Sequence, residues 1–273
     1  MRVSFFDRLV GAWGGAIAAM IDHPVLMNAK SGQLALSLWQ QLKEKGGIES
    51  VKLADDWGEH GLIEAFGVLP ILLFFHEDPL YLGDRLQMFA LTEAQEPILQ
   101  EMATVVSACM REILDFERLP QWLEQCSRLD SVGREYCLRH YDQGAPWRQF
   151  RRGLADLSLA PAETQLLVVY GALLWGHGQW QLCSTLVQSE DAIVQAWVQV
   201  LLGGILGDRR RPLSQQLGSD PLFLQKEIQQ FWSRWSGLPL ENQLHLDQVP
   251  IIANCQVIQF RPNLKLLSQR HFM

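Results

Sequence analysis

Apolar residues recur along this chain at the spacing of α-helices. Within residues 31–47, Leu34, Leu38 and Leu42 stand four positions apart, which places them on one helical face. Two glycines close this segment, where a helix C-cap belongs. Comparable apolar patterns predict further helices over residues 96–114, 118–129, 161–176, 191–207 and 221–235.

Residues 60–75 form a more continuous apolar run, which indicates a buried central helix that is kinked or restarts at Pro70. The pattern over residues 249–260 leaves strand and helix open. No low-complexity linker and no fixed-period repeat divides the chain. We therefore predict an all-α fold, a compact single-domain multi-helix bundle, with a C-terminal tail whose form, strand or helix, the pattern does not decide.

Two segments are unusually rich in small residues. Residues 7–20, DRLVGAWGGAIAAM, hold three glycines and four alanines around Trp13, so one helical face has almost no side chain. Residues 200–207, VLLGGILG, repeat this feature near the other end of the predicted bundle. Because another backbone can approach small residues closely, we expect these two helices to cross at the centre of the fold.

Composition and charge narrow the classes of partner. The chain has 273 residues, of which 48% are hydrophobic, enough to bury one large core. A formal net charge of -7 gives no general attraction to nucleic acid or to an anionic membrane surface, so we expect neither as a partner.

Compartment is indicated by cysteines and by the N-terminal apolar run. Five widely spaced cysteines without a CxxC pair favour reduced thiols. The uncharged run between Arg8 and Asp22 has about thirteen residues, too short to span a bilayer, and Asp7 interrupts any signal-peptide pattern. We expect a cytoplasmic protein with no transmembrane segment.

Five stretches resemble, in order, segments of the ADP-ribosylglycohydrolase family. DRLVGAWGGAIAAM is similar to the family's first helix, and SGQLALSLWQQL to the helix after its TDDT motif. GVLPILLFFHEDPLYLGDRLQMFALTEAQEP looks like the central segment, whereas QLLVVYGALLWGHGQWQLCSTL and VLLGGILG resemble the helices around the last metal motif. On this resemblance, residues 1–212 are an ADP-ribosylglycohydrolase-like helical domain, and residues 213–273 are a C-terminal helix and tail packed on it.

The resemblance implies an all-α fold in which two magnesium ions help to hydrolyse a bond to ADP-ribose. The family holds these ions with acidic and hydroxyl side chains of the TDDT motif and of a late DxD[ST] motif. Such oxygen ligands suit a hard divalent cation.

Those ligand types are missing at the matching positions of this chain. The TDDT motif falls on Ala29, Lys30, Ser31 and Gly32. The late motif falls on Val194, Ala196 and Trp197, and the acid of the first helix falls on Met20. Because a bound divalent ion usually keeps one or two protein carboxylates, we expect no binuclear centre, no metal and no cofactor. The chain is then a non-catalytic relative of the family.

Two alternatives keep a ligand site. The first is a hydrolase with a relocated metal site, for which the best local cluster is Asp55, Asp56, Glu59 and His60; these residues also fit a solvated loop or helix start. The second is a sensor that binds ADP-ribose or another nucleotide without hydrolysis, with Lys30 as phosphate partner. In this chain the family's ligand-binding cleft would be filled by the apolar residues Met20, Val194, Ala196 and Trp197. They disfavour the sensor, because removing phosphate from water is costly where no hydrogen-bond donors replace the water.

We therefore predict a protein-interaction, assembly or regulatory subunit whose partner is another protein. Interface hot spots favour Trp and Arg. The candidate interaction surface comprises Arg209, Arg210, Arg211, Trp232, Trp235, Phe260 and Arg261. Each of these tryptophans could instead lie in the core, and the three consecutive arginines could instead form a solvated helix end.

Overall fold

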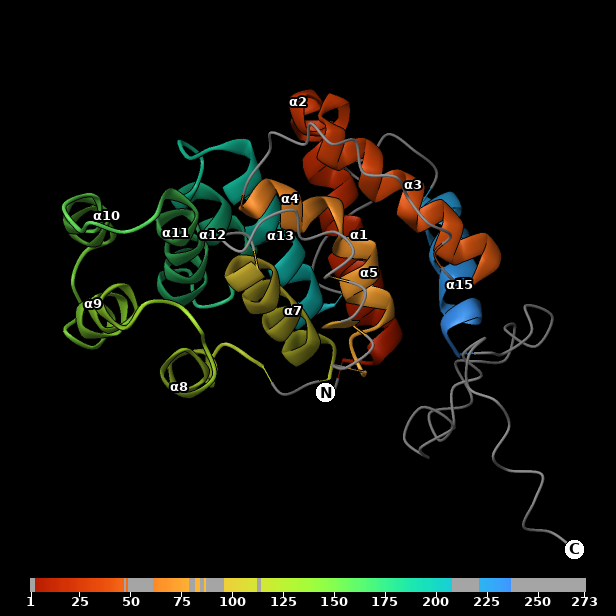
Figure 1. Cartoon of the computed structure of the whole chain (residues 1–273). Coiled ribbons are helices and arrows are strands. Elements are labelled where there is room, and N and C mark those ends of the chain that lie inside the picture. The colour runs from red at the N-terminus through yellow and green to blue at the C-terminus, as the bar shows by residue number, and fades with distance from the viewer. Residues whose placement is uncertain are drawn as a thin grey trace, which may run out of the picture.

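The computed structural model describes residues 3–46, 48, 61–78, 82–83, 86, 96–111, 114–207 and 221–236. Every regular element in these ranges is a helix and none is a strand, so the predicted all-α class is confirmed (Figure 1). The tail over residues 249–273, whose form the sequence leaves open, lies outside the described residues.

Thirteen helices are described, in chain order. They are α1 (Phe5–Asp22), α2 (Pro24–Asn28), α3 (Lys30–Lys45), α4 (Leu62–Gly67), α5 (Leu69–Phe74), α7 (Glu96–Met110), α8 (Leu119–Gln125), α9 (Ser131–Asp142), α10 (Trp147–Ala155), α11 (Pro161–Trp175), α12 (Trp180–Leu186), α13 (Ala192–Leu206) and α15 (Pro221–Ser236).

The apolar run over residues 60–75 forms two helices, as its proline suggests. α4 ends at Gly67, the chain turns at Val68, and α5 starts with Leu69 and Pro70 in its first turn. Proline is tolerated there because the first helical N–H groups have no intrahelical acceptor. The predicted restart is therefore confirmed, two residues earlier than a break at the proline itself.

The two small-residue segments, in α1 and α13, cross in the middle of the molecule (Figure 1). A Cβ atom added to Gly11 would lie 2.2 Å from the carbonyl oxygen of Gly203, and one added to Gly203 would lie 2.0 Å from that of Gly11. Gly15 faces the backbone of Gln199 at a similarly short distance. The predicted crossing is confirmed, and its backbones are too close for any side chain between them.

A buried arginine ties this crossing to a third helix. Arg8 in α1 donates from one guanidinium nitrogen to the carbonyl oxygens of Cys109 and Gly204, each at 3.1 Å. These acceptors lie in the last turns of α7 and α13, where carbonyl groups lack intrahelical donors. The positive charge also faces the negative ends of two helix dipoles, which stabilises the arrangement.

Aromatic stacking fixes α15 on α1 and α3. Trp13, Trp39 and Phe231 form a continuous parallel stack, with ring centroids 4.1 Å and 4.0 Å apart. Lys43 on α3 adds an ion pair to Glu227 on α15 at 2.6 Å. The described part of the predicted C-terminal extension therefore packs on the helical body, with Phe231 fully buried.

The short helices α8, α9 and α10 lie beside α11, at the end of the molecule opposite α3 and α15 (Figure 1). A buried carboxylate joins them to the body. Glu101 in α7 accepts hydrogen bonds from the Tyr170 hydroxyl at 2.8 Å, the Ser127 hydroxyl at 2.8 Å and the Arg128 backbone N–H at 2.7 Å. Three neutral donors compensate the lost hydration of this charge.

Candidate functional site

The positions that the resemblance assigns to metal ligands lie mostly in the hydrophobic core. Met20 at the end of α1 is 2% exposed, and Val194 and Ala196 in the first turns of α13 are no more than 1% exposed. Trp197 is fully buried beside them. These four buried side chains are apolar apart from the indole N–H of Trp197.

The Trp197 ring is fixed by one hydrogen bond and one aromatic contact. Its indole N–H donates to the carbonyl oxygen of Leu62 at 2.9 Å, which satisfies the one polar atom of the ring. Phe66 meets the ring edge-to-face, with centroids 6.1 Å apart. The Trp197 side chain therefore connects α13 to α4 and forms part of the core.

The start of α3 carries the other assigned positions. Lys30 is exposed at the first helical residue, whereas Ser31 is buried. A lysine at a helix N-terminus opposes the helix dipole, which favours anions there.

Glu64 in α4 is a buried acid that the sequence pattern did not mark as a candidate. Its side chain is 1% exposed, and neither carboxylate oxygen has a hydrogen-bond partner among the described residues. Burial raises the pKa of Glu64 to about 7, because the charged form loses its hydration. The one feature of the sequence that could have indicated this site is the position of Glu64 within the apolar run over residues 60–75.

Several predicted candidates lie outside the part of the chain that the structure describes. They are Asp55, Asp56, Glu59 and His60 of the relocated site, and Arg209, Arg210, Arg211, Phe260 and Arg261 of the interaction surface. Among the described residues, no group of three or more His, Cys, Asp or Glu side chains is placed to hold a metal ion.

The two tryptophans of the predicted interaction surface contact the protein's own helical body. Trp235 stacks on Phe5 at 4.5 Å and on His76 at 5.4 Å, and Trp232 meets Phe6 edge-to-face at 6.1 Å. Both tryptophans are only partly exposed. Trp232 and Trp235 thus help to attach α15 to the helical body.

An exposed apolar corner lies where α1 passes into α2. Val25 is 77% exposed, Ile21 44% and Met27 38%, so three large apolar side chains face solvent within seven residues. Leu26 between them points inward and is buried, which anchors the short helix. Single exposed apolar residues are ordinary, but a group of them is typical of an interaction site.

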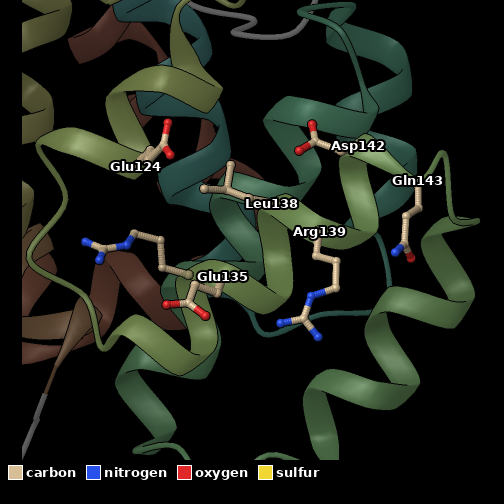
Figure 2. A pocket seen from close by; sticks show the side chains of 7 residues that line it. Glu124, Glu135, Leu138, Arg139, Asp142 and Gln143 are labelled. Atoms are coloured by element: carbon tan, nitrogen blue, oxygen red, sulfur yellow. The ribbon is translucent and has the colours of Figure 1, made fainter.

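A charged groove of about 580 Å³ lies between α8 and α9 (Figure 2). Leu138 lies between Glu124 and Asp142 in this view, whereas Glu135 and Arg139 project from another side of α9. No pattern in the sequence predicted a site here.

Comparison of the chain with known protein families, with curated proteins and with solved structures finds no match. The resemblance to the ADP-ribosylglycohydrolase family therefore stays a prediction. A separate finding concerns membranes: no helix in the described ranges is both long and apolar enough to cross one.

Proposed function

We propose that this chain is a non-catalytic helical protein, of the ADP-ribosylglycohydrolase type, that acts by binding another protein as an interaction, assembly or regulatory subunit. The observation that carries the binding role is the apolar corner of Ile21, Val25 and Met27, which is exposed in an otherwise well-packed protein. A partner that covers this corner gains the free energy of removing apolar surface from water.

The non-catalytic part of the proposal is supported by the packing around α13. Val194, Ala196 and Trp197 are core side chains with apolar neighbours, and the Trp197 N–H is already satisfied by a backbone carbonyl. A metal with its water ligands would need polar oxygen atoms at these positions. Restoring such a site would require replacing core residues.

The proposal is tested by capturing partners from a lysate of the native cells with the tagged full-length chain. Val25→Asp and Met27→Asp each place a charge in the apolar corner, so we expect each to reduce the amount of the captured partner at least tenfold, the size of a hot-spot effect. Both side chains are exposed, so the fold tolerates the changes.

Leu182→Asp is the matched control. Leu182 on α12 is 38% exposed, as is Met27, but it lies outside the corner. We expect this variant to capture the partner as the unaltered chain does. A partner whose capture is the same with all three variants would contradict the role of the corner, and the absence of any specific partner would contradict the proposed function itself.

A further inference from the structure

The apolar corner holds most of the large apolar side chains that the described residues expose. These side chains are Ile21, Val25, Met27, Val132 and Leu182. Val132 and Leu182 stand on separate helices, α9 and α12, whereas the other three lie together where α1 passes into α2. The corner is therefore the largest group of exposed apolar side chains in this part of the chain, and covering it removes apolar surface from water.

A strongly apolar segment of the same chain lies outside the described residues. Residues 249–260, VPIIANCQVIQF, include eight hydrophobic residues and no charged one. Asp247 precedes this segment and Arg261 follows it, so charges bound the apolar run on both sides. A run of this kind gains free energy by packing on apolar surface, and left in water it favours aggregation. We therefore looked for an apolar surface within its reach.

The last turn of α15 lies at the far end of α1 and α3 from the corner. Trp235 stacks on Phe5, the first residue of α1, and a Cβ atom added to Gly46, just after α3, would lie 3.9 Å from Arg234. The corner lies where α1 ends and α3 is about to begin, and Figure 1 shows α2 and α15 at opposite ends of α3. An 18-residue helix such as α1 is about 27 Å long.

The chain that connects α15 to the apolar segment is long enough to cover this distance. Residues 237–248 separate the end of α15 from residue 249. Twelve residues extend to about 40 Å at most, which exceeds the length of α1. The segment can thus reach the corner along the side of the body on which α15 already packs.

We propose that residues 249–260 dock on the apolar corner of their own chain and compete there with the partner protein. Burial of Ile21, Val25 and Met27 against the uncharged segment removes apolar surface of both from water. The contact itself stands on the corner, the segment and the reach of the chain. The competition rests in addition on the proposed function, because it regulates the same binding site.

Attachment to the same chain makes a weak contact sufficient. Binding groups joined by a short connection experience an effective concentration on the order of 1 mM. At this concentration, a contact whose Kd is about 100 µM between separate molecules is occupied roughly nine-tenths of the time. The corner is then open in about one molecule in ten, which weakens the apparent affinity for the partner about tenfold.

Cross-linking of the full chain tests the contact without any partner. Cys255 lies in the middle of the segment, and Val25→Cys places a second thiol on the corner, so that a short bismaleimide can bridge the two. Cys126→Ser is included in every variant, because Cys126 is exposed and the other described cysteines are buried. Ser37→Cys is the matched control: Ser37 is exposed and polar, and lies on α3 between the corner and the end of α15.

We expect peptide mapping to find the link between residues 25 and 255 within single chains, about tenfold more often than the link between residues 37 and 255. Adding Ile252→Asp/Ile258→Asp should reduce the first link to the level of the control. Equal yields of the two links would overturn the proposal, as would a link that the two aspartates leave unchanged. Links between different chains would overturn it as well, because they would place the segment on a second copy.

Capture of the partner by the full chain tests the competition. Ile252→Asp/Ile258→Asp should release the corner and raise the affinity for the partner about tenfold. Asn242→Asp/Gln243→Asp adds the same two charges before the segment and should leave the affinity unchanged. An affinity that the first pair does not raise would overturn the competition. If no partner is captured at all, the proposed function fails, whereas the cross-link still decides the contact.

Discussion

Two buried glutamates show how the surroundings of a residue decide its chemistry. Glu101 and Glu64 are each 1% exposed and each lies in a helix of the body. Glu101 accepts three hydrogen bonds, which stabilise a carboxylate away from water. Glu64 has no such donor among the described residues, and burial raises its pKa to about 7. Glu64 is therefore a proton-dependent weak point of the fold.

We predict that the free energy of unfolding falls as pH rises, because of Glu64. The folded state keeps the Glu64 proton up to about pH 7, whereas the unfolded chain releases it near 4.5. Between these values the folded state binds more protons, so stability is full below pH 4.5 and is lost as pH rises through 7. Urea unfolding should show that Glu64→Gln removes roughly 2 kcal/mol of destabilisation between pH 5 and pH 8.

Glu124→Gln provides the control for this pH effect, since Glu124 is an exposed glutamate of α8. The control should keep the pH dependence of the unaltered chain. A Glu64→Gln variant whose stability follows pH as the unaltered chain does would show that Glu64 is ionised in the folded protein at neutral pH.

The sequence predicts part of the candidate site at residue level. The sequence places the apolar residues Val194 and Ala196 in an apolar helix, and both are buried, as their residue types lead us to expect. Glu64 could not be assigned, because a single acid in an apolar helix is equally compatible with an exposed position. Val25 could not be assigned for the opposite reason: its apolar side chain indicates core, yet it is 77% exposed.

At the scale of helices, the crossing of α1 and α13 determines the arrangement of the body. Their glycines bring two backbones into contact, and Arg8 adds hydrogen bonds at the ends of α7 and α13. Close-packed interiors do not absorb added volume easily. The small-residue face is thus a packing requirement of the fold and needs no catalytic explanation.

We predict that Gly203→Ala destabilises the protein by roughly 3 kcal/mol or more, measured by urea unfolding. The new methyl group would lie 2.0 Å from the Gly11 carbonyl oxygen, so the helices must separate. The matched change Gly83→Ala adds the same group where no atom lies within 4 Å, and should alter stability by less than about 1 kcal/mol. Equal effects of the two substitutions would contradict the close crossing.

The helices that the sequence predicts are those with strong apolar periodicity or clear ends. Residues 161–176 and 191–207 correspond to α11 and α13 within one residue at each end. α9 and α10 were not predicted, because they are short and largely polar. These two helices are stabilised by tertiary contacts, such as the hydrogen bond from the Tyr136 hydroxyl to the Phe150 carbonyl oxygen at 3.1 Å. The spacing of apolar residues along the chain does not reveal such contacts.

At the scale of the whole molecule, the described helices form a well-packed body with separate surface features. Val194, Ala196 and Trp197 of α13 lie in its core, the apolar corner lies at α1 and α2, and the charged groove lies between α8 and α9. The proposed interaction role depends on these surface features. The sensor and the relocated hydrolase both require instead that a nucleotide or metal binds.

The most direct test of this account is the melting temperature of the full chain with and without magnesium or manganese, and then with ADP-ribose added. A ligand at about 100 times its Kd stabilises a folded protein by roughly 2.7 kcal/mol, which should raise the melting temperature of a chain of this size by about 5 °C or more. The account predicts no shift under any of these conditions. A shift with ADP-ribose alone would contradict it in favour of the sensor, and a metal-dependent shift would contradict it in favour of a working hydrolase.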